Sequence, residues 1–284
     1  MSNEVMENGA EIGHLTPNPL PNAEREKRGV ERQRARSVVQ AEDVEPWAEV
    51  VNGAALLDEL RETLHRHVVL PPHGSETLAL WVLHTYAFEL RSITTYVGVV
   101  SPEKRCGKTT LLSLLARLAN RPIVASNISP PALFRVIEEV EPTLIIDEAD
   151  SFLQGNEEMR GILNAGYSRE TAYVVRVANE FTTSTPHPSP LLGRGGEGEE
   201  RPRASRLVRF SCWCPKVMAA IGRLPETLAD RCIVLTMQRK KAREECGRLR
   251  NLDATILRRK CARFCGGSRG SNCSGKAASA RDVE

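Results

Sequence analysis

Residues 99–119 read VVSPEKRCGKTTLLSLLARLA and join an apolar segment, a loop and a leucine-rich helix. The loop ends in glycine, lysine and threonine, which is typical of a phosphate-binding loop with the pattern G-x-x-x-x-G-K-[ST]. In such a loop, backbone N–H groups at a helix N-terminus surround phosphate oxygens. Pro102 stands where the first glycine belongs, but the end of the pattern that contacts phosphate is intact. The stretch predicts a nucleotide site with these candidate binding residues: Glu103, Lys104, Arg105, Cys106, Gly107, Lys108, Thr109 and Thr110.

The last three residues of the pattern each suit a role. Gly107 has no Cβ that would keep the backbone away from a phosphate. Lys108 would reach the β- and γ-phosphates, and Thr109 would place its hydroxyl on Mg²⁺. A bare Gly-Lys-Thr also occurs at ordinary exposed helix starts, so its context decides between the two interpretations. Here a strand precedes the loop and an acidic strand end follows downstream, which favours the nucleotide site.

That acidic strand end is the segment TLIIDEAD, residues 143–150. Asp147 and Glu148 follow a short apolar run, at the carboxyl edge where open α/β sheets bind their ligands. We expect Asp147 to hold Mg²⁺ and Glu148 to act as general base for an attacking water. The alternative is a pair of acids that cap the next helix. A second carboxylate beside the metal ligand suits water attack, so hydrolysis is favoured over transfer to a substrate hydroxyl.

Apolar segments alternate with amphipathic ones from Ile93 onward. Strands are predicted over residues 93–100, 122–126, 142–147, 216–222 and 232–237. Helices are predicted over residues 107–120, 129–140 and 156–167. This alternation predicts an α/β fold in which helices flank a parallel sheet.

Two further helices are predicted before this alternation begins. Within residues 47–70 the leucines at positions 56, 57, 60 and 64 have the spacing of one helix face. Residues 75–90 start with Ser75 and Glu76, both of which are favourable at a helix start. The side chains of this second helix are apolar nearly all round, which predicts that it is buried.

The chain divides into five predicted parts: a disordered N-terminal segment (1–45), a helical extension (46–92), a P-loop ATPase core (93–240), a basic helix (241–265) and a disordered tail (266–284). A low-complexity insert, residues 182–205, interrupts the core. The phrase T-P-x-P-x-P begins at Thr16 and again, within the insert, at Thr185. Both copies are too rich in proline to pack. They resemble translated copies of a dispersed bacterial DNA repeat, which indicates a bacterial source.

The composition is that of a soluble protein, with 41% hydrophobic and 26% charged residues and a mean hydropathy of −0.31. No apolar run is long enough to span a bilayer, and the N-terminus lacks the features of a signal peptide. We therefore expect no membrane association and a cytoplasmic location, where the eight cysteines stay reduced. A net charge of +3 is too small to establish a nucleic-acid partner by itself.

With SPEKRCGKT (101–109), LIIDEAD (144–150) and IGRLPETLADRCIVL (221–235), the chain resembles the AAA-type P-loop ATPases. More narrowly, it is similar to an ATPase family of bacteria, phages and mobile elements that often stands beside primase-type modules. The resemblance covers about residues 47–264, and Pro102 fits the loop of this family. It implies a helicase-like ATPase that uses Mg-ATP in DNA replication or mobile-element maintenance, with DNA as a partner.

The resemblance also implies an arginine that acts between subunits. In AAA-type ATPases an arginine just before the last core strand reaches the γ-phosphate of the neighbouring subunit, and Arg231 matches that place. A catalytic role for Arg231 would require a homo-oligomer. The alternative is a surface arginine paired with Asp230 or Glu226, an arrangement that stabilises little.

The sequence departs from the family at two places. The strand before Arg231 ends in Ile221 and Gly222, where these enzymes usually carry a polar residue that senses the nucleotide. Asn164 and Arg169 are candidates to replace it. After residue 264 the chain turns into CGGSRGSNCSGKAASARDVE, which looks like a change of reading frame that removes the helical lid. A second hypothesis is therefore a nucleotide-binding scaffold or a truncated, inactive remnant.

Two further features have competing interpretations. Residues 239–263 are dense in arginine and lysine, with leucine and isoleucine at helical spacing. A basic helix of this kind could contact a phosphate backbone, but the favoured alternative is a solvated helix whose apolar stripe packs on the sheet or on the missing lid. Cys106 lies at a helix start beside cations, which favours a thiolate whose oxidation blocks nucleotide entry. The alternative is a small residue tolerated within the loop.

Overall fold

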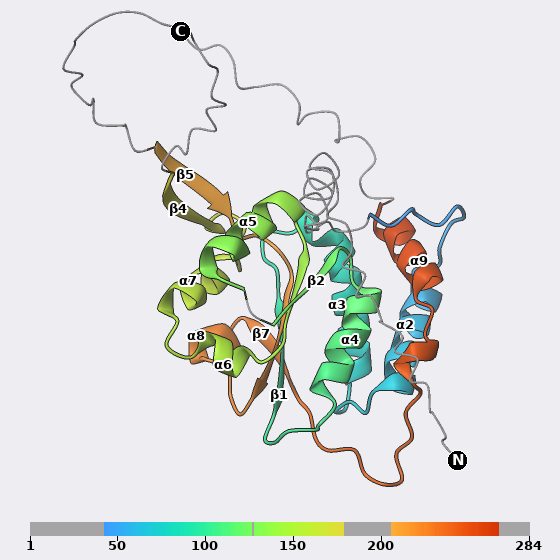
Figure 1. The fold of residues 1–284 in the computed structure, drawn as a ribbon. Coiled ribbons are helices and arrows are strands. Elements are labelled where there is room, and N and C mark those ends of the chain that lie inside the picture. The colour runs from blue at the N-terminus through green and yellow to red at the C-terminus, as the bar shows by residue number, and fades with distance from the viewer. Residues whose placement is uncertain (1–42, 127, 179–205, 267–284) are drawn as a thin grey trace, which may run out of the picture. The chain divides into compact units, whose positions relative to one another are not determined.

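Five parallel strands form the central sheet of the computed structural model, which describes residues 43–126, 128–178 and 206–266 (Figure 1). The described residues all fall within one unit, Ala41–Glu284. The strand order is β2-β3-β6-β1-β7. The strands span Tyr96–Ser101 (β1), Pro122–Ala125 (β2), Thr143–Ile146 (β3), Lys216–Ile221 (β6) and Cys232–Thr236 (β7). The predicted α/β fold with a parallel sheet is confirmed, and each of these strands falls within its predicted range except β1, which ends one residue later, at Ser101.

Strand β1 lies inside the sheet, between β6 and β7. Val97 of β1 pairs with Val217 on one side and Ile233 on the other. All six residues of β1 are buried, because helices cover both faces of the sheet. This burial explains why β1 reads as a nearly continuous apolar run rather than as an alternating pattern.

Helices flank the sheet on both faces. One face carries the helices α2, α3, α4 and α9, which share a core cluster with Val97 and Val99 of β1. The other face carries α5, α6, α7 and α8, which pack around Tyr96 and Val100 (Figure 1). These helices span Gly53–His67 (α2), Gly74–Ala87 (α3), Lys108–Leu118 (α4), Pro130–Val140 (α5), Ala149–Leu153 (α6), Glu157–Ala165 (α7), Glu226–Ala229 (α8) and Thr255–Gly266 (α9).

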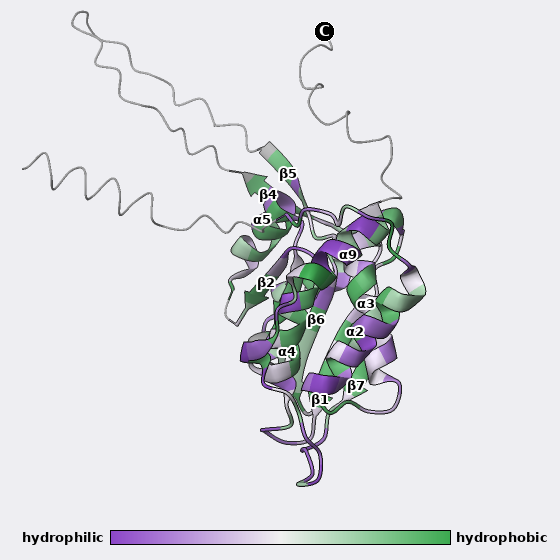
Figure 2. Cartoon of the chain, turned by 90° about the vertical axis from the view of Figure 1, so that its right-hand side faces the viewer, coloured by the Kyte–Doolittle hydropathy of each residue, from purple (hydrophilic) through white to green (hydrophobic). Residues whose placement is uncertain are grey.

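The chain direction explains this division of the helices. The connection from β1 to β2 runs one way across the sheet, whereas those from β2 through β3 and β6 to β7 run the other way. Right-handed crossovers therefore place α4 on one face and α5, α6, α7 and α8 on the opposite face. In Figure 2, β6 is largely hydrophobic, whereas α2 and α4 carry both hydrophilic and hydrophobic residues. This is expected for helices that cover a sheet with one face and meet water with the other.

The two N-terminal helices form largely as predicted. Leu56, Leu60 and Leu64 are buried, and burial of such a side chain contributes roughly 2 kcal/mol to folding. Asn52 caps α2 by accepting hydrogen bonds from two backbone N–H groups. Helix α3 begins before Ser75, after a left-handed residue at His73, so the predicted start at Ser75 is one residue late. Nine residues of α3 are buried, as its apolar surface predicted.

The basic helix predicted over 241–265 is shorter in the structure. A 3-10 turn, η2, covers Leu249–Asn251, and α9 begins only at Thr255, whose backbone N–H donates to Asp253 at 2.9 Å. This local hydrogen bond competes with an earlier helix start. The apolar residues of the segment pack mainly against α2 and α3 rather than against the sheet.

A β-hairpin that the sequence analysis did not predict flanks the insert. β4 (Tyr173–Ala178) pairs antiparallel with β5 (Arg206–Ser211), and Phe210 packs on Phe134 of α5 at a centroid distance of 4.7 Å. The signal for the hairpin was the alternation in YVVRV and LVRF, on either side of the insert. The insert itself, residues 182–205, lies outside the described residues, as do residues 1–42 of the predicted disordered segment (1–45) and residues 267–284 of the predicted disordered tail (266–284). Gly266, the first residue of that predicted tail, is instead the last residue of α9.

Within the described ranges, every helix is too short or too polar to cross a lipid bilayer.

Candidate nucleotide-binding site

The predicted phosphate loop connects β1 to α4. Gly107 is the N-cap of α4 and has a left-handed backbone, with φ at 82°. A side chain at this position would strain the backbone, because residues other than glycine rarely adopt this positive φ. Space does not forbid a side chain, since the nearest atom to an added Cβ is Met237 Cε at 3.9 Å. Arg105 also has a left-handed φ of 66°. The loop thus turns twice through conformations that most residues avoid, and it uses glycine at the second.

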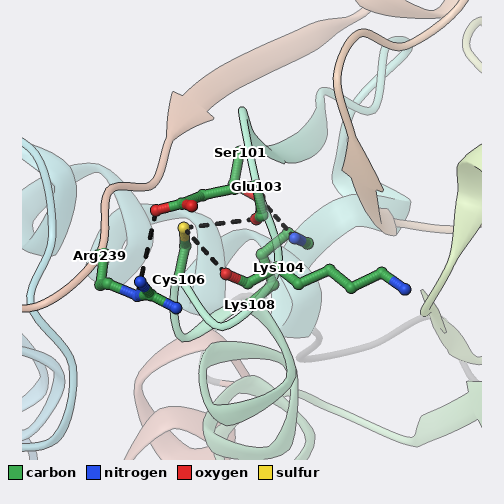
Figure 3. Close-up of polar contacts among 6 residues, drawn as sticks. All are labelled: Ser101, Glu103, Lys104, Cys106, Lys108 and Arg239. Carbon is green, nitrogen blue, oxygen red and sulfur yellow. Dashed lines mark hydrogen bonds and ion pairs between the residues drawn. The ribbon is translucent and has the colours of Figure 1, made fainter.

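Side chains hold the turn in which proline replaces the expected glycine (Figure 3). The Ser101 hydroxyl donates to the Glu103 carbonyl oxygen at 2.6 Å. The Cys106 thiol donates to the same oxygen at 3.4 Å and to the Lys104 carbonyl at 3.8 Å. These contacts stabilise the loop from inside, which is a physical reason why it closes without the flexibility of a first glycine.

Cys106 is only 4% exposed and packs in the core cluster beneath the loop. Its sulfur contacts carbonyl oxygens inside the loop. This burial favours the alternative of a small, structural residue.

The ammonium group of Lys108 lies against the end of the strand. Lys108 Nζ donates to Ser101 Oγ at 2.5 Å (Figure 3). An ammonium group has three donors, so this contact leaves it able to bind other acceptors. Thr110, the last candidate of the loop, is exposed on the first turn of α4.

The two predicted magnesium ligands are in direct contact. Thr109 Oγ1 donates to Asp147 Oδ2 at 3.1 Å, although β6 separates the strands that lead to them. The contact forms because the carboxyl ends of parallel strands lie at the same edge of the sheet. A hydroxyl and a carboxylate are oxygen ligands of the kind that Mg²⁺ prefers. The residues present therefore fit a magnesium ion bound beside the loop.

Glu148 lies next to this pair and is exposed. Its backbone is left-handed, with φ at 55°, and its N–H donates to Asp147 Oδ1 at 2.9 Å. Non-glycine residues in this conformation are costly and occur often at functional sites. Glu148 is the N-cap of α6, but its side chain makes no capping hydrogen bond. The alternative of acids that merely cap the next helix therefore has no support from this side chain.

Backbone and side-chain contacts join the strand ends at this edge. Ile221 N–H donates to Asp150 Oδ1 at 3.1 Å, and Gly222 N–H donates to the Ser101 carbonyl at 2.8 Å. Asp150, the last residue of DEAD, aligns α6 with β6 and was not among the candidate residues predicted from the sequence. The end of β6 offers these N–H groups and no polar side chain.

Asn164 and Arg169 do not lie at this edge. Arg169 N–H donates to the Ser92 carbonyl, and residue 92 precedes β1, whereas the phosphate loop follows it. Asn164 Nδ2 donates to Thr227 Oγ1 at 3.2 Å, and Thr227 likewise precedes β7. The expectation that either residue replaces the missing sensor within its own chain is wrong, because a strand's length separates each from the loop.

Arg231 lies at the same remote edge. Its carbonyl accepts from Tyr96 N–H at 3.0 Å, at the start of β1, so about five strand residues of about 3.3 Å each separate it from the loop. Its guanidinium donates to the Thr227 carbonyl and lies 5.6 Å from the Tyr167 ring centroid. Over the described part of the chain, Arg231 makes no ion pair with Asp230 or Glu226. Arg231 therefore cannot reach the loop of its own chain.

A mainly apolar cavity of about 460 Å³ lies beside the edge strand β7, and its lining does not suit a triphosphate. It is lined by Val100, Gly222, Arg223, Leu224, Glu226, Ala229 and Val234. The loop residues and the acidic pair lie outside this lining, so the cavity is distinct from the candidate site.

No protein-family model matches this chain, and a search of curated proteins found no match.

Proposed function

We propose that the protein binds Mg-ATP at the loop between β1 and α4 and hydrolyses it. The observation that carries this proposal is the contact between Thr109 and Asp147, two residues far apart in sequence with oxygen atoms 3.1 Å apart. It supports the proposal because a phosphate loop needs a metal-binding acid at the same sheet edge.

Each residue of the site has a role in this proposal. The N–H groups at the start of α4, together with Lys108, bind the phosphates, since a helix N-terminus favours negative charge. Thr109 and Asp147 would hold Mg²⁺, which neutralises charge on the phosphate oxygens. Glu148, exposed next to Asp147, orients a water molecule and accepts its proton.

The proposed reaction is completed by Arg231 of a second copy of the chain. The geometry supports an action between subunits only in that Arg231 lies at the opposite edge from its own loop. Such a role requires that its guanidinium leave Tyr167 and the Thr227 carbonyl. A link to DNA replication or mobile-element maintenance, with helicase-like work on DNA, rests on the family resemblance alone.

The second candidate function is a nucleotide-binding scaffold that does not couple hydrolysis to work. Two observations favour it. The strand end at Ile221 and Gly222 carries no polar side chain that could sense the nucleotide, and Arg231 faces inward toward Tyr167. ATP would then stabilise the fold without driving a motion.

Nucleotide binding and turnover by three variants test the proposal. Lys108→Ala should weaken Mg-ATP binding by at least about tenfold, because it removes a charge-assisted hydrogen bond to phosphate. Glu148→Gln should keep the affinity and lose about 10²- to 10⁴-fold in turnover, because it removes the general base. Lys240→Ala, an exposed lysine beyond β7, is the matched charge control. Wild-type protein that binds no Mg-ATP would overturn the proposal.

Turnover with and without single-stranded DNA separates the two candidate functions. Stimulation by DNA supports the motor. Binding of Mg-ATP with neither turnover nor stimulation supports the scaffold.

A further inference from the structure

The segment that follows β7 passes beside the phosphate loop. Met237 N–H donates to the Val100 carbonyl at 2.7 Å, which extends the pairing of β7 with β1 by one residue. The Met237 side chain is 1% exposed and lies beneath Gly107. The backbone after Met237 is thus fixed at the carboxyl edge of the sheet, and the next residues include Arg239.

Arg239 faces the loop. Its Nε lies 4.0 Å from Glu103 Oε1, and the two side chains are 57% and 55% exposed (Figure 3). Such an exposed pair stabilises the protein very little. Its importance is positional, because it places a guanidinium group beside the loop that would surround the phosphates.

Glu103 is an unfavourable residue for a loop that binds an anion. Its carboxylate would repel phosphate, and its position next to Arg239 means that it competes with phosphate for the same cation. At the end of β6, where a polar side chain would otherwise contact the nucleotide, the chain has Ile221 and Gly222. Arg239 approaches the loop from the end of β7, which lies on the opposite side of β1 from β6.

We propose that Arg239 is a phosphate-binding residue of its own chain's site, and that Glu103 restrains it until a nucleoside di- or triphosphate takes its place. This inference rests on the proposed nucleotide binding and adds a residue to that site. Arginine suits the role because its planar group binds phosphate oxygens through two parallel hydrogen bonds. Because Glu103 and phosphate compete, the two residues should have opposite effects on affinity.

Calorimetric titration of the full chain with Mg-ADP tests the inference. Arg239→Ala should weaken binding about three- to tenfold, because a solvent-exposed charged hydrogen bond is lost. Glu103→Gln should tighten binding about two- to fivefold, because it removes a competing charge. Arg61→Ala is the matched control, since Arg61 on α2 also forms an exposed ion pair, with Asp58 at 3.6 Å, and should leave the affinity within about twofold.

The double variant tests whether the two residues act on the same phosphate contact. If Glu103 acts by restraining Arg239, the gain from Glu103→Gln should shrink in the Arg239→Ala background. An equal gain in both backgrounds would overturn the restraint. An Arg239→Ala affinity within twofold of wild type would overturn the phosphate contact.

Lys108→Ala distinguishes failure of this inference from failure of the proposed function. If Lys108→Ala weakens Mg-ADP binding and Arg239→Ala does not, only the role of Arg239 is lost. If the wild-type chain binds no Mg-ADP, nucleotide binding and the inference both fail. Thermal unfolding of each variant confirms that the substitutions leave the fold intact.

Discussion

The ammonium group of Lys216 is fully buried at the start of β6. It donates to the Cys212 carbonyl at 2.9 Å, to the Cys214 carbonyl at 3.0 Å and to the Tyr96 hydroxyl at 3.3 Å. A buried charge is tolerated only when its donors are satisfied in this way. Lys216 therefore fixes the residues between β5 and β6 to β1, far from the phosphate loop.

We expect Lys216→Met to lower the free energy of unfolding by about 2–4 kcal/mol, because two carbonyl oxygens and a hydroxyl lose their donor. Lys240→Met, which changes an exposed lysine in the same way, should stay within about 0.5 kcal/mol of wild type. Urea denaturation measures both. Equal stability of the two variants would show that the Lys216 contacts contribute nothing net.

His84 provides a prediction about pH at the same scale. Its Nε2 lies 2.8 Å from the hydroxyl of the buried Thr94. Burial, with a smaller contribution from Arg91, lowers the pKa of His84 from its ordinary value of 6.5. In the unfolded chain the ring takes up a proton below about pH 6.5, whereas the folded ring resists it, so stability falls as the pH falls through this value.

His84→Gln should remove this contribution while keeping a hydrogen-bonding side chain. We expect the variant to lose less stability than wild type between pH 7.5 and pH 5, measured by chemical denaturation at each pH. A parallel decline of the two proteins would contradict the assignment.

At the scale of elements, the hairpin of β4 and β5 shows how an insert can be accommodated. The chain enters the hairpin after Thr171, near the amino edge of the sheet, and leaves it through Cys212 toward the start of β6. The phosphate loop and Asp147 lie at the carboxyl edge. The base of the hairpin thus lies at the edge of the sheet that is remote from the candidate site.

Replacing residues 179–205 with Asn-Gly tests this separation, because Ala178 pairs with Arg206 and a two-residue turn can connect them. The shorter connection should raise the free energy of unfolding by up to about 2 kcal/mol through its lower closure entropy. Mg-ADP affinity, measured by calorimetry, should not change. Loss of folding or of nucleotide binding would show that the replaced residues contribute to the core or the site.

At the scale of the whole molecule, the two edges of the sheet carry different candidate groups. Lys108, Thr109 and Asp147 lie at the carboxyl edge, whereas Arg231 lies at the amino edge. One chain therefore cannot bring all four groups to one nucleotide. If Arg231 takes part in hydrolysis, two copies must meet so that the amino edge of one faces the carboxyl edge of the other.

Mixing two inactive variants tests this arrangement. Lys108→Ala lacks the phosphate-binding lysine, and Arg231→Ala lacks the arginine, but a mixed assembly contains a site with both. ATP turnover of an equimolar mixture should rise above that of either variant, to about a quarter of wild type for random dimers. Turnover that stays at the level of the separate variants would exclude a role for Arg231 between subunits.

Local pattern was enough to predict the strands of the parallel sheet, most of the helices and the candidate loop. Five apolar segments became the five strands of the sheet. Helices on both faces bury the inner strands β3, β6 and β1 almost completely, and burial of that kind leaves a continuous signal in the sequence. The start of α9 was misplaced because one hydrogen bond, from Thr255 to Asp253, sets it locally. The hairpin was missed because its two strands are interrupted by the insert.

The sequence by itself thus determined the five strands of the sheet and most of the helices, and that Gly107, Lys108 and Thr109 stand at a helix start. Only the tertiary structure decided which groups share an edge. It brought Thr109 to Asp147, placed Asn164, Arg169 and Arg231 at the opposite edge, and brought Arg239 to Glu103. The physical reason is that strand order and crossover direction depend on pairing between distant segments, which no local pattern of side chains encodes.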